Sequence, residues 1–584
     1  MRTSVSIPSQ VTPSSVLAAH AAFLRANSEA YEWLVEKIQA MDLRKETEAV
    51  LGRVALAARF AAVFHPGRFA DGAIENLALQ IGVELDHLLA KDGGFALPVA
   101  PKESRRRVLH VASIVHGIGG HTRMLYHWVR NDQGSCHSVV LLNQRDGPIL
   151  PWLSEPVPQW LSEAVQSSGG DLVVFPPGSP LCNKAKWLRE MARRSADLVV
   201  LHHHPFDVVP TVAFAMHECP PVALVNHADH QFWLGSSVSD LVINLRTAAT
   251  EHTEKRRFVS SNTVLPIPLA DPAGQVSRRD ARRFLGLPED HVVLLSIGHK
   301  EKYRPCGAFD FVATAGKILD RQPGAHLYVV GDSAAGIAPY LHCAVHERLH
   351  FVGSMEDPSL YRAVADVYLE SFPFGSQTAL LEAALSELAV VPAYAPLFPL
   401  LVANDDALQG FLPNPHNEQE FVERTELFIR QPEQRLELGR LLRRRLLVDH
   451  VGQGWLERLT VVYQETEGLT HNPRPIPACP CSMTNTDIGL SLWHVMADGK
   501  TYSPGGPTDE LSAVLGHSAF VAKYVGNYAK ARQFAWRAVQ HDPYRRASWY
   551  LLAVTVLGRA EKFIRQVLRR ICRGVVNKWT CPAL

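Results

Sequence analysis

The sequence predicts an α/β protein with two lobes, each built on a parallel sheet, and with helical segments at both ends. Its 584 residues are too many for one hydrophobic core. Residues 108–115 form an apolar run that is followed by a glycine-rich loop and a helix-like stretch. Residues 366–391 have the order strand, polar loop, helix, strand. Because this alternation is typical of crossover units in a parallel sheet, we expect two Rossmann-like lobes, at 105–275 and 276–470.

The composition argues against several classes of protein. The chain carries 59 Lys and Arg against 58 Asp and Glu, a net charge of +1, so its bulk charge gives no reason to expect a nucleic-acid partner. Nine scattered cysteines, an odd number, indicate free thiols in a reducing compartment. The N-terminus lacks the pattern of a signal segment, and no apolar run reaches membrane-spanning length. We therefore expect a cytoplasmic protein without a transmembrane segment; peripheral contact with the inner membrane face is an open alternative.

Residues 1–104 are predicted to form a helical accessory domain. Apolar periodicity indicates helices at 16–24, 30–41, 49–64 and 73–81. No catalytic constellation occurs among these stretches, so packing or contact with a substrate is the expected role.

The first lobe begins with the strand at 108–115 and a loop in which glycines allow the backbone to approach a ligand. The candidate cleft residues of this loop are Gly117, Gly119, Gly120, His121 and Arg123. A G-x-G-G loop alone is a weak signal, because it lacks the third glycine and the downstream acid of a dinucleotide fingerprint. It also lacks the Gly-Lys-Ser/Thr of a nucleotide triphosphatase. A tight turn with a surface His and Arg explains the loop about equally well.

Two groups of histidines follow later strands of the first lobe. Strand 197–201 runs into three consecutive histidines, but neighbouring residues on a strand point to opposite faces, so we predict no metal site there. Strand 222–225 leads into a loop with His227, Asp229 and His230. A histidine beside a carboxylate is suited to general base catalysis, which makes these three residues catalytic candidates. Loop histidines that only satisfy backbone groups are the competing interpretation.

The loop at 372–378 is the strongest binding candidate of the second lobe. It precedes a helix, so free N–H groups and the helix dipole favour a phosphate beside Ser376 and Thr378. Glu382 follows one turn into this helix, where its carboxylate could accept hydrogen bonds from ribose hydroxyls. A diphosphate next to a ribose indicates a nucleotide-linked substrate. On this stretch alone, an ordinary crossover with a Pro-Phe turn remains the alternative.

The segment FPFGSQTALLEA resembles the donor loop of nucleotide-sugar glycosyltransferases of the GT-B type. Its spacing is most similar to the O-linked N-acetylglucosamine transferase-like branch, whose loop reads roughly Phe-Pro-Tyr-Asn-Gly-x-Thr-Thr before an acid. The resemblance places Gly375, Ser376 and Thr378 on the small-residue positions and Glu382 on the acid. The Glu-x7-Glu motif of family-four glycosyltransferases would need Glu at position 374, where this chain has Phe374.

Two further segments extend the resemblance. The glycine loop of the first lobe is similar to the first loop of family-four-like GT-B enzymes, which implies that His121 and Arg123 face the cleft. The run from Lys302 to Pro305 resembles the Lys-x-x-Pro turn of the same transferase branch, where the lysine neutralises the donor diphosphate. A cation there would stabilise the negative charge of the leaving nucleoside diphosphate. Lys302 is the first choice for this role and Arg304 the second.

The C-terminal part is predicted as a linker at 471–507 and a tetratricopeptide-like helical tail at 508–584. Small and aromatic residues in 526–543 match the second half of a tetratricopeptide repeat. Fewer than three repeats do not form a free-standing solenoid, so we expect the tail to dock on the body or on a protein partner. A basic amphipathic helix is predicted at 563–575.

The resemblance implies a glycosyltransferase that moves a hexosyl unit from a nucleotide diphosphate sugar, with UDP favoured, to a hydroxyl group. The acceptor would be a glycan, a lipid-linked glycan or a protein, with the first lobe on the acceptor side and the second on the donor side. No Asp-x-Asp pair occurs in the chain, so we expect neither a metal nor a cofactor. Two alternatives stay open: a non-hydrolysing sugar-nucleotide epimerase, and an inactive scaffold that acts as an interaction protein.

Overall fold

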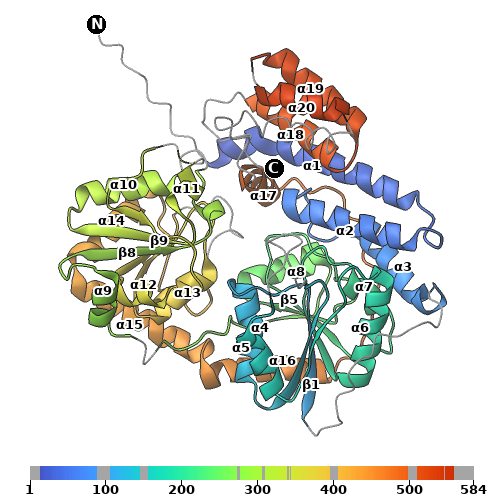
Figure 1. Ribbon diagram of the computed structural model, residues 1–584, viewed down its shortest axis with the longest axis horizontal. Coiled ribbons are helices and arrows are strands. Elements are labelled where there is room, and N and C mark those ends of the chain that lie inside the picture. Colours follow the sequence, from blue (N-terminus) through green and yellow to red (C-terminus); the bar gives the residue numbers. More distant parts are fainter. Residues whose placement is uncertain are drawn as a thin grey trace, which may run out of the picture.

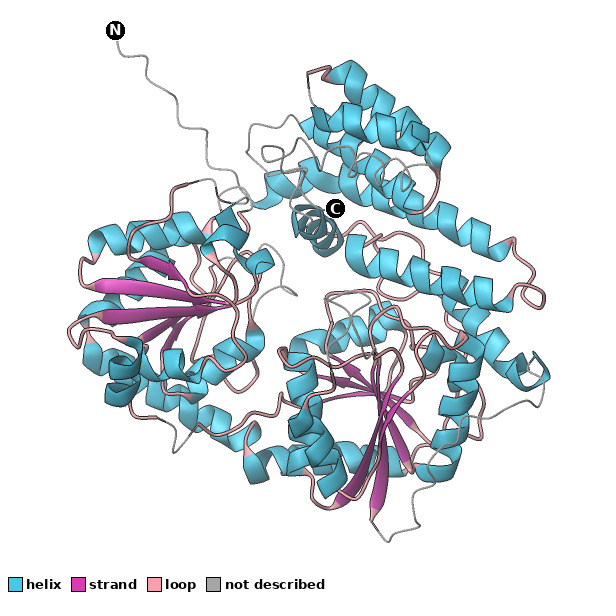
Figure 2. Cartoon of the chain, in the orientation of Figure 1, coloured by secondary structure: helices cyan, strands magenta, loops and turns pink. Residues whose placement is uncertain are grey.

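The computed structural model describes residues 13–88, 105–144, 156–272, 276–305, 309–338, 341, 343–394, 405–497, 510–544 and 546–557. These residues form two α/β lobes and a layer of helices that lies beside the first lobe (Figures 1 and 2). Both sheets are parallel and have helices on their faces, as the sequence predicted. In the part of the chain that is described, no helix is both long enough and apolar enough to cross a bilayer.

The first lobe is built on a sheet whose described strands have the order β3-β2-β1-β4-β5-β6-β7. Its strands are β1 (Arg106–Ala112), β2 (Ser135–Leu141), β3 (Leu172–Val174), β4 (Leu198–His202), β5 (Val222–Asn226), β6 (Leu241–Asn244) and β7 (Asn262–Val264). Its helices are α4 (Gly120–Asn131), α5 (Gln159–Ser167), α6 (Leu181–Ser195), α7 (Val209–Ala213) and α8 (Thr250–Arg257). Strands β4 and β5 are buried along their whole length because helices cover both faces of a parallel sheet.

The second lobe has the strand order β10-β9-β8-β11-β12. Its strands are β8 (Val292–Ile297), β9 (Ala325–Val330), β10 (Leu349–Phe351), β11 (Val367–Leu369) and β12 (Ala389–Val391). Its helices are α9 (Arg278–Leu285), α10 (Phe311–Arg321), α11 (Ala334–Ile337), α12 (Ser359–Val364), α13 (Gln377–Leu385), α14 (Glu418–Arg430) and α15 (Pro432–Asp449), with a short 3-10 helix, η2 (Lys300–Tyr303). The order reverses between β8 and β11, so the loops that follow these two strands leave the sheet side by side.

Helix α16 (Gly452–Glu467) follows the second lobe in sequence but packs on the first. The Trp128 indole N–H donates to the Tyr463 hydroxyl at 3.0 Å, and that hydroxyl donates to the Asp132 carboxylate at 2.6 Å. The Trp455 indole N–H donates to the Pro266 carbonyl at 2.8 Å. The boundary predicted at residue 470 assigns this helix to the second lobe, whereas its side chains pack in the core of the first lobe.

This packing predicts that Trp455→Ala destabilises the first lobe by about 3 to 5 kcal/mol, since it empties a fully buried indole site. Urea unfolding followed by circular dichroism measures the change. Val461→Ala is the matched control, because Val461 lies on the same helix with 46% of its surface exposed. We expect a change within about 0.5 kcal/mol for this control. Equal unfolding midpoints for the two variants would contradict the assignment of α16.

The helices of the two chain ends pack together. They are α1 (Pro13–Gln39), α2 (Thr47–Phe64), α3 (Gly72–Leu88), α17 (Asn485–Ala497), α18 (Glu510–Tyr524), α19 (Tyr528–His541) and α20 (Arg546–Leu557). The Asn27 amide donates to the Ser491 hydroxyl at 2.9 Å, and its oxygen lies 2.6 Å from His517 Nε2. The Phe64 ring lies 5.3 Å from the Tyr524 ring. The predicted N-terminal domain and C-terminal tail thus form one helical layer.

The segment predicted as a linker at 471–507 is structured where it is described. It contains α17, and the extended chain before this helix is hydrogen-bonded to the start of α3. Gly72 N–H donates to the Pro477 carbonyl at 2.9 Å, and Cys479 N–H donates to the Asp71 carboxylate at 3.0 Å. A Pro-rich sequence shows no apolar periodicity, so its structure could not be predicted from the sequence and is fixed by these tertiary contacts. The helix predicted at 563–575 lies outside the described residues, and the tetratricopeptide likeness stays a prediction.

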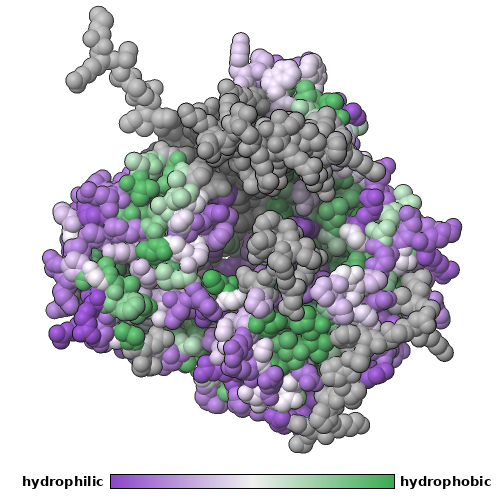
Figure 3. Space-filling model, viewed as in Figure 1, coloured by the Kyte–Doolittle hydropathy of each residue, from purple (hydrophilic) through white to green (hydrophobic). Residues whose placement is uncertain are grey.

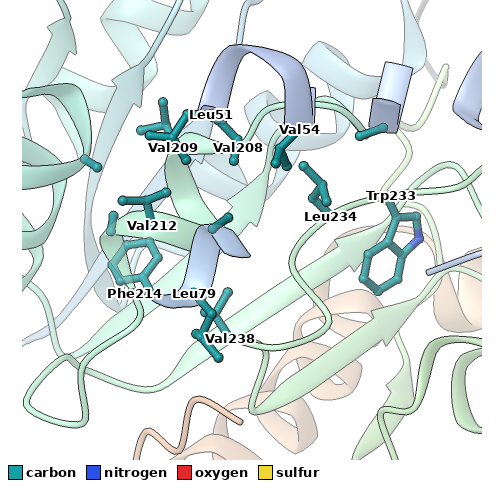
Figure 4. Close-up of a cluster of buried hydrophobic side chains, with 14 of the residues drawn as sticks. Leu51, Val54, Leu79, Val208, Val209, Val212, Phe214, Trp233, Leu234 and Val238 are labelled. Carbon is teal, nitrogen blue, oxygen red and sulfur yellow. The ribbon is translucent and has the colours of Figure 1, made fainter. Parts of the chain in front are cut away.

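The helical layer and the first lobe share one hydrophobic core. Leu51 and Val54 of α2 and Leu79 of α3 pack with residues of and near α7 (Figure 4). The other labelled residues in this view are Val208, Val209, Val212, Phe214, Trp233, Leu234 and Val238. The space-filling view is hollowed near its centre, where the two lobes and the helical layer meet (Figure 3).

Candidate active site

A cavity of about 430 Å³ lies between the two lobes, at the carboxyl ends of their strands. This is the edge where open α/β sheets bind ligands. The first lobe contributes Gly119, Gly120, His121, Met124, His227, Asp229, His230, Leu245, Arg246 and Ile267 to its walls. The second lobe contributes Ile297, Gly298, His299, Lys302, Phe374, Gly375, Ser376, Gln377, Thr378 and Ala379.

A second cavity of about 460 Å³ lies at the opposite edge of the second lobe's sheet, where Asp366 precedes β11. Arg278 and Arg435 line it, and each donates to the same Asp366 carboxylate oxygen at 2.7 Å. These arginines already have an ionic partner, and the cavity lies at the amino ends of the strands. The cavity between the lobes is therefore the better candidate for an active site.

Lys302 and the predicted donor loop meet on one wall of this cavity. Lys302 lies in η2 after β8, and the loop with Gly375 follows β11, the strand beside β8. Lys302 Nζ donates to the Gly375 carbonyl at 2.7 Å and lies 4.5 Å from the centre of the Phe374 ring. Burial lowers the pKa of Lys302 to about 8, and the nearby Glu370 carboxylate opposes this shift. The structure thus brings together a cation and a loop that the sequence separates by 73 residues.

The start of helix α13 supplies hydrogen-bond donors to the same wall. Ser376 is the residue before the helix, and Gln377, Thr378 and Ala379 of its first turn line the cavity. The N–H groups of a first helical turn have no acceptor within the helix, and the helix dipole is positive at this end. A diphosphate placed here would meet these N–H groups and the Lys302 ammonium.

Two glycines allow close approach in the cavity. A Cβ at Gly298 would lie only 2.9 Å from the Ser376 hydroxyl oxygen, so the turn after β8 can lie against the donor loop. A Cβ at Gly120 would lie 3.0 Å from the Thr378 hydroxyl oxygen, which belongs to the other lobe. The sequence analysis did not predict a role for Gly298. Its position directly after a buried strand was the feature that could have indicated one.

The fixed tautomers of two cavity histidines follow from their backbone partners. His227 Nδ1 lies 3.2 Å from the Val225 carbonyl and His121 Nε2 lies 2.6 Å from the His202 carbonyl. A carbonyl only accepts, so these nitrogens carry the protons, which leaves a lone pair on His227 Nε2 and on His121 Nδ1. Burial lowers the pKa of His121 to about 4 and that of His227 well below its usual value. Both rings are therefore neutral at pH 7, and each keeps one nitrogen with a lone pair.

Asp229 does not pair with His227, although their spacing in the loop allowed such a pair. Its Oδ2 accepts from Arg246 Nε at 2.7 Å, and its Oδ1 lies 3.6 Å from His230 Nδ1. Burial opposes ionisation of Asp229, but the charge of Arg246 outweighs it and holds the pKa of this carboxyl below its usual range. The carboxylate thus positions Arg246 and His230, and the His230 ring contacts Phe374 of the other lobe at 5.4 Å.

Four of the predicted residues lie outside the cavity wall. Glu382 accepts a hydrogen bond from Arg362 Nη1 at 2.8 Å. Arg304 is buried beside Glu301, with 3.6 Å between guanidinium and carboxylate. Arg123 Nη2 donates to the Glu356 carbonyl at 2.7 Å and so links the two lobes. Gly117 precedes the wall formed by Gly119 and Gly120. None of these four described residues lines the cavity, because neighbouring helices or loops hold them elsewhere.

The first two of the three consecutive histidines at the end of β4 have separate partners. His202 Nε2 lies 3.0 Å from His110 Nδ1, and His203 Nε2 donates to the Leu234 carbonyl at 2.9 Å. Among the residues that the structure describes, no group of three or more His, Cys, Asp or Glu side chains is arranged to hold a metal ion.

Glu370 supports the donor loop from behind the cavity wall, a role that the sequence analysis missed. It directly follows β11, and its Oε1 accepts hydrogen bonds from the backbone N–H of Ser371 at 3.0 Å and of Ser376 at 2.6 Å. Burial raises the pKa of Glu370 to about 7, although the Ser376 N–H bond acts in the opposite direction. An acid at the carboxyl end of a strand, directly before the donor loop, was the signal that could have found it.

No protein-family model and no curated protein matches the chain. Solved structures that resemble it include a glycosyltransferase from Rickettsia africae, at 11% identity and a TM-score of 0.46, which covers 63% of this chain and 100% of its own. HepE from Anabaena in complex with UDP and glucose has 15% identity, a TM-score of 0.47 and coverages of 62% and 100%. A mutant O-GlcNAc transferase from Thermobaculum terrenum has 17% identity, a TM-score of 0.43 and coverages of 76% and 82%. Because these TM-scores are below 0.5, the chain's own sheet topology defines its fold here.

Proposed function

We propose that the chain is a glycosyltransferase of the GT-B type that binds a nucleotide diphosphate sugar between its lobes. The observation that carries this proposal is the meeting of Lys302 with the start of α13 on one cavity wall. A partly buried ammonium and the positive end of a helix dipole are complementary to a diphosphate. The resemblance of the donor loop favours UDP as the nucleotide.

The same groups support the chemistry of transfer. As the bond between the sugar and the diphosphate breaks, negative charge grows on the leaving oxygen, and a preorganised cation beside it lowers the barrier. The acceptor oxygen attacks the anomeric carbon, and its proton goes to a base on the opposite wall. His227 is our choice for this base, because the Val225 carbonyl holds its Nδ1 proton and leaves a lone pair on Nε2. His230, beside Phe374, is the candidate for a contact with the sugar.

The acceptor is a hydroxyl group on a glycan, a lipid-linked glycan or a protein, and the first lobe would hold it. The helical layer joins the core of that lobe, so it is the expected boundary of the acceptor site and a candidate surface for a protein partner. A cytoplasmic location suits an enzyme that uses activated sugars.

A thermal-shift panel tests the proposal directly. We expect one of UDP-, GDP-, ADP- or dTDP-sugars to raise the unfolding midpoint, because a ligand at about 100 times its Kd stabilises a folded protein by about 2.7 kcal/mol. A shift with none of them would contradict the proposal and favour an inactive scaffold. An isomerised sugar nucleotide without any transferred product would favour the epimerase instead.

A further inference from the structure

One peptide unit before α13 is held by Lys302, which lines the cavity, and by Glu370, which is buried behind the donor loop. The Gly375 carbonyl accepts from Lys302 Nζ at 2.7 Å, and the N–H of the same peptide, on Ser376, donates to Glu370 Oε1 at 2.6 Å. Lys302 thus donates to a backbone carbonyl, and the Glu370 carboxylate accepts from a backbone N–H beside the helix start. Glu370 takes the place that an anion would have at the positive end of a helix.

The Glu370 carboxylate is poorly balanced for a buried charge. The residue has no exposed surface, and its three hydrogen bonds all go to Oε1: the third comes from the Ser371 hydroxyl at 3.2 Å. In the part of the chain that is described, Oε2 is buried without a hydrogen-bond partner. A buried carboxylate oxygen without a donor favours the protonated form, in which that oxygen carries the proton.

The groups that face Glu370 leave Lys302 as its balancing charge. Tyr303 of η2 and Tyr368 of β11 also interact with the carboxylate, but burial raises the pKa of both phenols, so they stay neutral. Ser371 and Ser376 contribute uncharged donors. A diphosphate that engages Lys302 would draw this cation into a new pairing and bring like charge close to the carboxylate.

We propose that Glu370 is a positioning residue that takes up one proton from solvent when a nucleotide diphosphate sugar binds beside Lys302. The proton adds to Oε2 and yields a neutral carboxyl group, which removes the repulsion between Glu370 and the diphosphate. No other bond forms or breaks, and the proton returns to solvent when the nucleoside diphosphate leaves. This inference rests on the proposed function. It means that binding of the nucleotide sugar is coupled to the uptake of one proton.

The sign of the pH dependence follows from this linkage. Binding favours protonated Glu370, whose pKa in the free protein is about 7, so affinity is highest below that value and falls as the pH rises through it. Lys302, with a pKa of about 8, adds a second fall at higher pH. A nucleotide sugar is the right probe, because its diphosphate lacks the terminal ionisation near pH 6 that a free phosphate has.

Isothermal titration calorimetry of the full chain in buffers of different ionisation enthalpy measures the uptake. The probes are UDP-glucose, GDP-mannose, ADP-glucose and dTDP-glucose. With the ligand that binds, we expect the wild type to take up about three quarters of a proton more than Glu370→Gln at pH 7.5. Glutamine keeps an acceptor for Ser376 N–H but cannot ionise, so its affinity at pH 8.5 should exceed that of the wild type by about 30-fold. Glu347→Gln, at an exposed carboxylate of the same lobe, is the matched control and should behave as the wild type.

Each outcome decides the matter. Equal proton uptake by wild type and E370Q, with both binding, would overturn the role of Glu370 and leave the proposed function intact. No binding of any of the four probes to the wild type would overturn both. If E370Q does not fold, the wild type is measured from pH 6.5 to pH 7.5, below the pKa of Lys302, and an affinity that stays constant over this range overturns the inference.

Discussion

Replacing Lys302 by methionine is expected to weaken the binding of UDP by about 10- to 100-fold. A hydrogen bond between a charged donor and a charged acceptor contributes about 1.5 to 3 kcal/mol, and each 1.4 kcal/mol changes Kd about tenfold. Methionine retains the length and apolar stem of the lysine but loses the ammonium that lies between Gly375 and the cavity. Isothermal titration calorimetry at pH 7 and low salt gives the two dissociation constants.

Lys300→Met is the matched control for this loss. Lys300 lies in the same 3-10 helix, but its ammonium lies 3.8 Å from the Asp332 carboxylate and does not line the cavity. We expect its Kd for UDP to change less than threefold, in line with a partly exposed ion pair worth less than about 1 kcal/mol. If K302M binds UDP as the wild type does, or if both variants lose affinity equally, the diphosphate site is not where we place it.

Replacing His227 by glutamine is expected to lower kcat for sugar transfer by about 100- to 10,000-fold, the usual contribution of a general base. The affinity for the nucleotide sugar should change little, because donor binding is assigned to the opposite wall. Burial holds the pKa of His227 well below its usual value, so the ring stays unprotonated as the pH falls below neutrality. The acid limb of the pH–rate profile should therefore lie below pH 6.5, the ordinary histidine value.

His416→Ala and His230→Ala complete this test. His416 is exposed on the second lobe, and its removal should leave kcat unchanged. Loss of His230 should raise KM for the donor more than it lowers kcat, because that ring is assigned to the sugar. A wild-type rate in H227Q together with a large fall of kcat in H230A would move the base to His230.

The lobes and the donor loop were predictable from sequence because they depend on local order. An apolar strand, a loop rich in Gly, Ser and Thr, and an amphipathic helix define a crossover unit within about 25 residues, and such a unit places its loop at the carboxyl edge of the sheet. The resemblance of 372–378 to a donor loop pointed to Ser376 and Thr378, and both line the cavity. The placement of His227 after a buried strand was likewise readable, since β5 is a continuous apolar run.

Side-chain pairing was not predictable, because it depends on which helices lie next to one another. Glu382 has the residue type and position of a ribose ligand, but α12 places Arg362 within 2.8 Å of its carboxylate. Asp229 is two residues from His227, yet its carboxylate accepts from Arg246, which follows β6. In both cases a partner that is distant in sequence satisfies the carboxylate, and sequence spacing contains no information about that partner.

The sequence by itself determined the two α/β lobes, the crossover units and the chemistry of the donor loop, because apolar periodicity and turn residues act over short stretches of chain. Only the tertiary structure decided that Lys302 touches that loop, because the strand order β10-β9-β8-β11-β12 sets β8 beside β11 although two strands intervene in sequence. The same holds for the single helical layer made from both chain ends and for Glu370. Burial and long-range neighbours set the balance of charge there, and these are properties of the packed molecule.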